Sequence, residues 1–377
     1  NTNDSFLDDA VNITATGTGG ANAADVSGAN AILGAANSGT KTIEEVRDTA
    51  DQAALLSVGA NETVSLLTVT DGAEDSEAVA IHALIGNGVT TASFSIEDTG
   101  TNVAALTSGV LGSAENITTT GAAISASDAG KILGASNSGT TTLSAVTGTA
   151  AQILALPIAS NDTITTVTVT GTATAQQALD IATLDALTGV GTVTIAAVSD
   201  TALALSGATN AALDLVTGTV TATTAATAAQ ATALQVFTEA VVYSVSDTGA
   251  NVVAQIATNT NDNFLDDAVE VTLTGTSTVA QAAAAEAATN SGTTTVEAIE
   301  DTAALLAGSS NAVLNLVSGT VTASTAANAA EATTLQGFTE AVVYSVSDTA
   351  AAIAAQITTN TNDSFLDDAV NITATGT

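Results

Sequence analysis

The sequence predicts an α/β protein, a right-handed repetitive solenoid in which parallel strands alternate with short Ala-rich helices. Residues 1–18 recur letter for letter as residues 360–377, and a near-copy occupies residues 259–276. Runs that alternate Val or Ile with Thr also recur, separated by Ala-rich segments with helical spacing. An all-β solenoid is the alternative, but the density of Ala, Gln and Glu favours helices.

The repeat has a long and a short period. The 34-residue segment that begins at Leu215 is nearly repeated from Leu316, an offset of 316 − 215 = 101 residues. Inside this period, Asp-Thr pairs recur at spacings near fifty residues, so the chain holds about seven units of roughly 51 residues. We therefore expect residues 1–377 to form a single continuous repeat array, which is a fragment of a longer repetitive protein.

Each unit contains two predicted strands and two predicted helices. The first kind of strand ends in Gly, as in residues 167–172 and 271–276, and the second ends in Asp-Thr, as in residues 194–200 and 241–247. Between strands, apolar residues three apart predict one buried helix face in residues 175–187. Strands joined by helices are expected to be parallel, with right-handed crossovers.

The recurring Asp-Thr pair stands where a helix N-cap is expected, because Asp accepts backbone N–H groups and complements the helix dipole. The aspartates of the series are Asp48, Asp98, Asp200, Asp247, Asp301 and Asp348. Asn-Ser-Gly and Thr-Gly are predicted to close many of the helices. A carboxylate ladder is the alternative reading of the same series.

Charge and composition exclude several classes of function. The chain has 3 Lys and Arg against 38 Asp and Glu, a formal charge of −35, which disfavours nucleic acid and anionic membrane surfaces and favours cations. Disorder is the alternative for so acidic a chain, but the regular placement of the apolar residues favours order. There is no Cys, so disulfides and thiolate sites are excluded. The longest strongly apolar stretch, residues 153–159, is far below the ~20 residues of a membrane-spanning helix, so no membrane insertion is expected.

The candidate metal ligands lie in three copies of an Asn- and Asp-rich segment. Oxygen ligands clustered within seven residues suit a hard cation such as Ca²⁺, whereas the alternative is a solvated turn that caps neighbouring elements. The spacing matches neither an EF-hand loop nor a glycine-rich calcium-binding repeat. The candidate ligands are Asn3, Asp4, Asp8 and Asp9; Asn261, Asp262, Asp266 and Asp267; and Asn362, Asp363, Asp367 and Asp368.

Two other features recur. Thr at alternate strand positions, such as Thr168 and Thr170, would form columns on a sheet face, which suits lateral packing, an ordinary half-exposed strand or an ice-binding surface. Phe6, Phe264 and Phe365 recur in the Asp-rich segment, and with so few aromatic residues in the chain we expect them to anchor the core.

Catalysis has little to build on, and we predict that the protein is not an enzyme. His82 is the chain's single His, and a Ser-His-Asp site would be unique within an otherwise duplicated array. No catalytic residue and no organic cofactor is predicted.

Phrases such as VTVTGTATAQQA and FTEAVVYSVSDT resemble the repeat regions of giant secreted cell-surface proteins of cyanobacteria and other marine bacteria, including the surface protein involved in swimming of marine Synechococcus. The resemblance implies an extracellular or cell-surface structural protein, often calcium-dependent. We therefore predict a filament, sheath, surface layer or adhesin stalk that self-associates into fibres or lattices with divalent cations as partners. A ligand-binding adhesin module, for glycan or ice, is the alternative.

Overall fold

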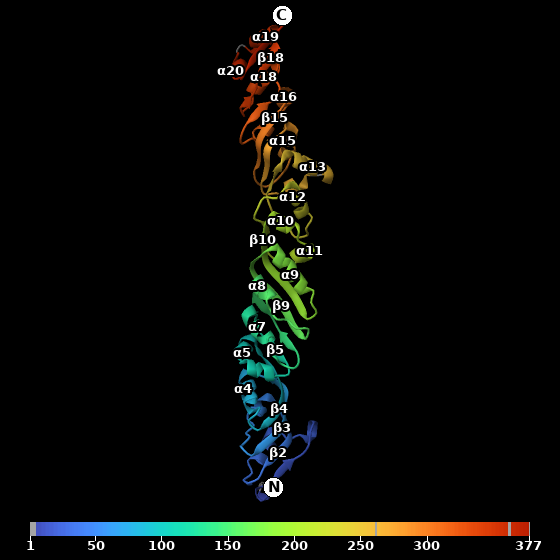
Figure 1. The fold of residues 1–377 in the computed structure, drawn as a ribbon, viewed down its shortest axis with the longest axis vertical. Coiled ribbons are helices and arrows are strands. Elements are labelled where there is room, and N and C mark those ends of the chain that lie inside the picture. The colour runs from blue at the N-terminus through green and yellow to red at the C-terminus, as the bar shows by residue number, and fades with distance from the viewer. Residues whose placement is uncertain (1–4, 261, 361–362, 377) are drawn as a thin grey trace. The chain divides into compact units, whose positions relative to one another are not determined.

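The computed structural model describes residues 5–260, 262–360 and 363–376. The chain divides into two compact units, Asn1–Ala173 with Gln177–Ala196 and Thr174–Gln176 with Ala197–Thr377. The division falls within α9 and β10. In each unit, elements that follow one another in sequence are stacked side by side (Figure 1).

The first unit alternates strands with short helices. Its strands are β1 (Ile13–Ala15), β2 (Lys41–Asp48), β3 (Glu62–Ala73), β4 (Val89–Thr99), β5 (Ile117–Thr120), β6 (Ile124–Ser125), β7 (Thr141–Leu143), β8 (Val146–Gly148), β9 (Asp162–Ala173) and the first part of β10 (Val190–Asp200). Its helices are α1 (Ser5–Asp8), the 3₁₀ turn η1 (Gly20–Asn22), α2 (Val26–Leu33), α3 (Ala50–Ala53), α4 (Asp75–Leu84), α5 (Gly100–Ala105), α6 (Ser108–Ser113), α7 (Ala126–Leu133), α8 (Ala150–Leu154) and most of α9 (Ala175–Asp185).

The second unit repeats the same alternation with shorter strands. After the end of β10, its strands are β11 (Val220–Ala222), β12 (Val241–Val242), β13 (Val245–Thr248), β14 (Val271–Ser277), β15 (Thr294–Asp301), β16 (Val321–Ala323), β17 (Val342–Val343), β18 (Val346–Thr349) and β19 (Ile372–Thr375). Its helices are α10 (Ala202–Ser206), α11 (Asn210–Leu213), α12 (Ala228–Gln235), α13 (Gly249–Asn259), α14 (Asn263–Asp266), α15 (Val279–Glu286), α16 (Ala303–Ala307), α17 (Asn311–Leu314), α18 (Ala329–Gln336), α19 (Ala350–Asn360) and α20 (Ser364–Asp367).

The predicted fold class is confirmed, because parallel strands alternate with helices to form a repetitive solenoid. Neighbouring strands pair in parallel, as in Lys41 with Glu62, Thr141 with Asp162 and Val220 with Val241. We call the stretch from one strand to the next parallel strand stacked on it a coil. The helices exclude the all-β alternative.

The core is thin and built mainly from small and branched aliphatic side chains. The inward strand side chains are mostly Val, Ile and Leu, such as Val64 and Ile164, and Ala129 and Ala231 are among the helix residues that cover them. Strands stack ~4.8 Å apart, whereas helices usually lie ~8–10 Å apart. Because Ala side chains are small, helices that carry them can lie closer together than usual. The high Ala content of the chain is therefore explained by the close stacking of coils.

Two predicted elements differ in the structure. Residues 241–247 form two short strands, β12 and β13, because β12 pairs with β11 and β13 pairs with β14 in a different sheet. The Asn-Ser-Gly motif does not close a helix. Gly39 approaches the backbone of Val11 so closely that a Cβ would lie 1.4 Å from its carbonyl oxygen, so glycine is needed there for contact between coils.

Candidate functional site

Carboxylates of the Asp-Thr series link one coil to the coil before it. Asp301, at the end of β15, accepts a hydrogen bond at Oδ2 from the backbone N–H of Val279, the first residue of α15 (3.1 Å). Its Oδ1 accepts from the N–H of Thr302 (2.8 Å). Both carboxylate oxygens therefore accept hydrogen bonds. One of them pairs with the first N–H of a helix in the preceding coil, a group that has no partner within its own helix. The negative charge of the carboxylate also interacts favourably with the positive end of that helix dipole.

The same arrangement recurs in both units. In each case the first N–H of a helix donates to an acceptor 19 to 25 residues later in the chain. The donor and acceptor pairs are Val26 and Asp48, Ala50 and Asp71, Asp75 and Asp98, Ala175 and Asp200, Ala202 and Thr224, Ala228 and Asp247, Val279 and Asp301, Ala303 and Thr325, and Ala329 and Asp348.

The prediction that Asp caps its own helix is therefore wrong in detail. The N-cap is the Thr of each pair: the hydroxyl of Thr302, for example, accepts from Leu305 N. The Asp one residue earlier is still at the strand end, where its side chain reaches the neighbouring coil. The sequence repeat located the Asp-Thr series. It could not show whether each Asp carboxylate accepts a hydrogen bond from a helix of its own coil or from a helix of the neighbouring coil.

Asp98 shows the electrostatic effect of these contacts. Burial raises the pKa of its carboxyl, but hydrogen bonds from the N–H groups of Asp75 and Thr99, together with the Asn102 side chain, outweigh burial and leave the pKa below its ordinary value. The folded state therefore stabilises the ionised form of Asp98 relative to its protonated form.

The Asn- and Asp-rich segments form short helices, α1, α14 and α20. Four of the predicted ligands, Asn3, Asp4, Asn261 and Asn362, lie outside the described residues. Asp262 and Asp363 precede the first residues of α14 and α20 without a side-chain cap. Asp8, Asp9, Asp363, Asp367 and Asp368 are exposed.

In the second copy, the two adjacent carboxylates diverge. Asp266 Oδ1 accepts from the N–H of Thr289 in the following coil (2.6 Å), as Asp8 does from Ala36 (2.6 Å). Asp267 instead lies beside Tyr243 of the preceding coil and contributes to raising the pKa of its phenol. The pair therefore connects a coil to both of its neighbours instead of converging on one point.

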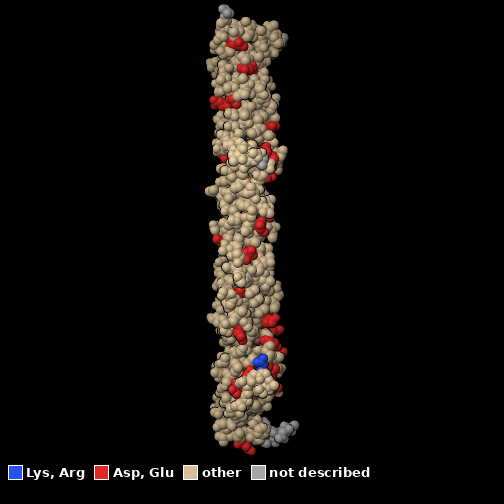
Figure 2. Space-filling model, turned by 90° about the vertical axis from the view of Figure 1, so that its right-hand side faces the viewer, with Lys and Arg blue, Asp and Glu red and all other residues tan. Residues whose placement is uncertain are grey.

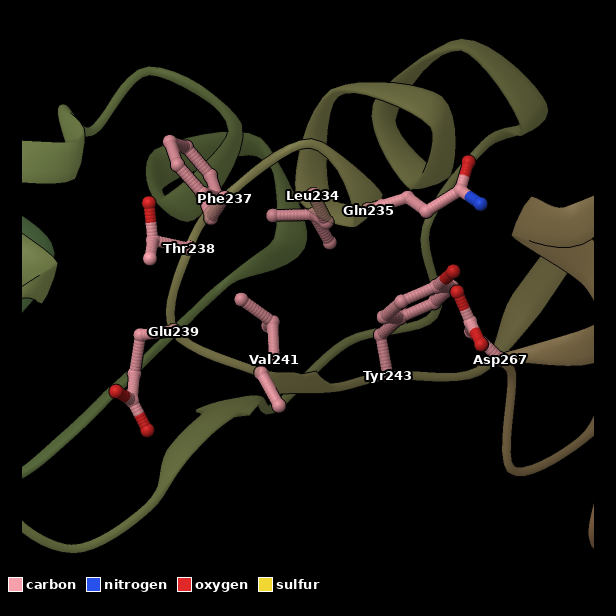
Figure 3. A pocket seen from close by; sticks show the side chains of 9 residues that line it. Leu234, Gln235, Phe237, Thr238, Glu239, Val241, Tyr243 and Asp267 are labelled. Carbon is pink, nitrogen blue, oxygen red and sulfur yellow. The ribbon is translucent and has the colours of Figure 1, made fainter.

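Tyr243 and Asp267 belong to a pocket of about 300 Å³, which sequence reasoning did not find (Figure 3). The Tyr243 hydroxyl is buried and donates to the carbonyl oxygen of Phe264 (3.0 Å). The pocket is lined by Leu234, Gln235, Phe237, Thr238, Glu239, Ala240, Val241, Tyr243 and Asp267.

An equivalent pocket of about 350 Å³ lies one long period later. It is lined by Leu335, Gln336, Phe338, Thr339, Glu340, Ala341, Val342, Tyr344 and Asp368, the same residue type at every position. Tyr344 donates to the carbonyl of Phe365 (2.8 Å), and burial, with the Asp368 charge, raises the pKa of its phenol to about 12. The feature of the sequence that could have indicated these pockets is that both tyrosines of the chain stand close to acidic residues.

The same contacts explain the recurring phenylalanines. Phe264 and Phe365 are fully buried beneath these tyrosine-bearing coils, as predicted, whereas Phe6 is 69% exposed. Among the described residues, no tyrosine-bearing coil covers Phe6. Burial of this ring is therefore decided by the neighbouring coil and not by its own segment.

The described residues offer a poor fit to a calcium site within the Asp-rich segments. In the part of the chain that the structure describes, no group of three or more Asp, Glu, His or Cys side chains is arranged to hold a metal ion. Asp266 has one oxygen committed to Thr289, and Asp267 faces the other way. Ca²⁺ usually takes six to eight oxygens, so these two carboxylates do not form its ligand set together. Calcium binding stays a prediction.

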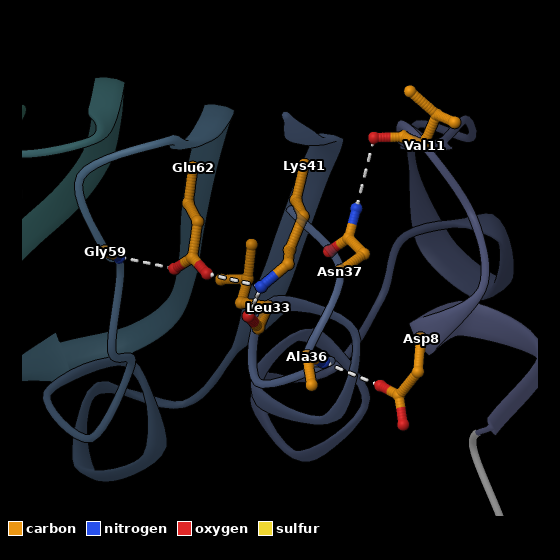
Figure 4. Close-up of polar contacts among 8 residues, drawn as sticks. All are labelled: Asp8, Val11, Leu33, Ala36, Asn37, Lys41, Gly59 and Glu62. Carbon is orange, nitrogen blue, oxygen red and sulfur yellow. Dashed lines mark hydrogen bonds and ion pairs between the residues drawn. The ribbon is translucent and has the colours of Figure 1, made fainter. Parts of the chain in front are cut away.

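The first unit contains a buried ion pair that the sequence did not suggest (Figure 4). Lys41 is 8% exposed; its Nζ donates to Glu62 Oε1 (2.9 Å) and to the carbonyl of Leu33. Glu62 also accepts from the N–H of Gly59. The ammonium therefore joins the end of α2 to the strand of the next coil.

His82 has a structural contact. Its Nδ1 lies 3.0 Å from the Ser113 hydroxyl, which donates to the carbonyl of Val110. The bond connects α4 to α6 in the following coil.

Threonines stack in register on the sheet, but the columns are short. Thr14, Thr42 and Thr63 lie on adjacent strands, as do Thr118, Thr142 and Thr163. Glu97 is the neighbour of Thr118 on β4 and places a charge at the end of the second column. On the face shown in Figure 2, acidic side chains are scattered in small groups over a largely uncharged surface.

Among the described residues, no helix has the length and apolar character to cross a membrane.

No protein-family model matches the chain, and no curated protein sequence is similar to it. Among solved structures, the chain is weakly similar to the crystal structure of the leucine-rich-repeat ectodomain of the plant membrane receptor kinase GASSHO1/SCHENGEN3 from Arabidopsis thaliana in complex with CASPARIAN STRIP INTEGRITY FACTOR 2, with 8% identity and a TM-score of 0.18. The match covers 89% of this chain and 49% of that one, so the chain spans about half the length of that ectodomain.

Proposed function

We propose that the chain has an extracellular structural role, as a filament, sheath, surface layer or adhesin stalk. The observation that carries the proposal is the recurring bond from the first N–H of a helix to an acceptor of the following coil, as in Val279 and Asp301. Nearest-neighbour contacts of this kind hold a repeat array together without a large core. They use carboxylates for cohesion between coils instead of gathering them into a cleft.

Microscopy of the purified chain tests the structural role. The high negative charge should keep protomers apart at low ionic strength, and divalent cations should screen that repulsion. We expect filaments or lattices in electron micrographs with Ca²⁺ or Mg²⁺, and their loss with a chelator. Particles that stay single under all of these conditions would contradict self-association.

For the extracellular location, an antibody against the chain should label intact cells, and surface proteolysis should remove the label.

A specific calcium site is the finer part of the proposal, and calorimetry separates it from screening. The Asp262→Asn, Asp267→Asn, Asp363→Asn and Asp368→Asn variant removes four carboxylates of two Asp-rich segments but leaves Asp266 bonded to Thr289. Specific binding predicts saturable heat with Ca²⁺ that this variant loses. Equal heats with Mg²⁺ and Ca²⁺ in both proteins would indicate screening alone.

A ligand-binding adhesin module is the second candidate, and the recurrence of the tyrosine pocket favours it. A glycan array probed with the chain tests the glycan form of this proposal. The ice-binding form rests on the threonine columns, one of which ends at Glu97. Thermal hysteresis at or below that of an acidic control protein would rule out ice binding.

A further inference from the structure

The tyrosine pockets are rich in hydrogen-bond acceptors and have no cation to neutralise them. Glu239 and Asp267 line the first pocket, and no Lys or Arg does. The three basic side chains of the chain, Lys41, Arg47 and Lys131, all precede both pockets in sequence. A ligand that carries positive charge and donates hydrogen bonds would therefore complement the lining.

The two carboxylates are separated by apolar groups. In Figure 3, Glu239 and Asp267 lie at opposite ends of the lining residues, and Val241 and the Tyr243 ring lie between them. Leu234 and the half-buried Phe237 ring form the other side. The order along the pocket is thus carboxylate, hydrocarbon and aromatic ring, carboxylate.

We propose that each pocket binds a linear alkyl diamine, with one ammonium group at Glu239 and the other at Asp267. The methylene chain would lie over Val241 and Tyr243, where it replaces water at apolar surface. The aromatic rings add cation–π attraction for an ammonium group. The second pocket places Glu340 and Asp368 in the same roles, so one chain binds two diamines.

Two other ligand classes fit the lining less well. A divalent metal ion requires several oxygens that converge on one point, whereas these carboxylates stand at opposite ends of the pocket. A neutral sugar needs donors as well as acceptors from the protein. Here the hydroxyls of Thr238 and Tyr243 already donate to Asn210 Oδ1 and to the Phe264 carbonyl, which leaves the Gln235 amide as the side-chain donor in the lining. Both classes are outcomes of the test.

The chain supplies its own reporter for that test. It has two Tyr and no Trp, and each tyrosine lines one pocket. Tyrosine fluorescence is therefore recorded during titration with 1,4-diaminobutane at constant ionic strength. We expect a saturable change and, by calorimetry, two equivalents per chain. 1-Butylamine should bind about tenfold more weakly because it loses one ion pair, and 1,4-butanediol should not bind.

The matched variants change the same charge inside and outside the pockets. Glu239→Gln with Glu340→Gln should weaken diamine binding at least about tenfold, whereas Glu270→Gln with Glu300→Gln, two exposed glutamates outside the pockets, should bind like the parent. Circular dichroism verifies that both variants fold. The proposal is overturned if no saturable change occurs, if both variants weaken binding equally, if 1,4-butanediol or a sugar binds as well as the diamine, or if Ca²⁺ at matched ionic strength competes as well as the diamine.

Discussion

Lys41 illustrates how single residues adapt a repeated coil. The corresponding residue one period later is Thr141, whose hydroxyl donates to Asn137 Oδ1 (3.3 Å), and Thr294 donates in the same way to Asn290 (2.9 Å). Lys41 turns to Glu62 instead, so the Oδ1 of Asn37 is buried without a hydrogen-bond partner. The ion pair between Lys41 and Glu62 thus takes the place of the neutral hydrogen bond between Thr and Asn. It leaves the Oδ1 atom of Asn37 without a donor.

We predict that Lys41→Ala destabilises the first unit by about 2–4 kcal/mol, because it leaves the Glu62 carboxylate half-buried without its cation. Urea unfolding followed by circular dichroism measures the change. The matched control is Lys41→Thr with Glu62→Asp, which copies the pair of Thr141 and Asp162. This double variant should recover most of the loss, and a double variant no more stable than Lys41→Ala would contradict the account.

The two tyrosines give a second residue-scale prediction, on pH. Burial raises the pKa of Tyr344 from 10.0 to about 12, and it raises that of Tyr243 as well. A raised pKa in the folded state means that the stabilisation is present below pH 10 and is lost as the pH rises toward 12. Phenolate absorbance should therefore appear together with unfolding. Ionisation of both tyrosines near pH 10 in a protein that remains folded would be inconsistent with their burial.

At the scale of an element, the coil-linking carboxylates decide how helices begin. Asp301 receives N–H groups from Val279 and Thr302, so it serves the helix of the preceding coil and the strand end of its own. The Thr302 hydroxyl caps α16 independently. Removing the aspartate should therefore loosen the start of α15 more than that of α16.

We predict that Asp301→Ala costs about 1–2 kcal/mol, the usual effect of losing a cap. Asp301→Asn should cost less, because one amide oxygen remains to accept one of the two hydrogen bonds. Hydrogen exchange at Val279 and Ala280, measured against that at Ala303, localises the effect. Faster exchange at α16 than at α15 would show that the aspartate serves its own helix.

For the whole molecule, acid should remove stability through carboxylates that the fold holds ionised. Hydrogen bonds from the Gly19 N–H and the Thr68 hydroxyl lower the pKa of the buried Glu45 carboxyl, and the Asp98 pKa is lowered as described above. Glu77 acts in the opposite sense, since burial and the nearby Asp51 raise its pKa.

A lowered pKa contributes stability above the ordinary values of 4.5 for Glu and 3.8 for Asp, and this stability is lost as the pH falls through the folded-state value. We therefore expect the free energy of unfolding to fall below about pH 4.5. Urea unfolding at a series of pH values measures it, with Glu45→Gln as the comparison. A Glu45→Gln profile that falls as steeply as that of the parent would exclude Glu45 as a contributor.

The charge of −35 leads to a prediction on salt. Repulsion between exposed carboxylates is screened within ~10 Å at 0.1 M salt, whereas the short coil-linking hydrogen bonds are screened much less. The melting temperature at pH 7 should therefore rise with NaCl. A melting temperature that falls with salt would mean that ion pairs outweigh repulsion, although few basic side chains are present to form them.

The sequence by itself determined the repetitive α/β fold. Valine and threonine alternate in β9, which has one face on the core and one on solvent, and this pattern is local, so it can be read without a structure. It also located the Asp-Thr series and the recurring phenylalanines. In α9, the predicted apolar face is only partly buried: Ile181 is buried, but Leu187, beyond the helix end, is 48% exposed.

Only the tertiary structure decided which coil each side chain serves. Asp301 reaches back to Val279, Asp267 faces Tyr243 while Asp266 reaches Thr289, and Phe264 is buried where Phe6 is not. These partners lie about one coil away in sequence, and nothing in the local pattern indicates whether the preceding or the following coil supplies them. The reason is geometric: stacking brings residues of successive coils together, and it is this stacking that creates both the coil-linking bonds and the tyrosine pockets.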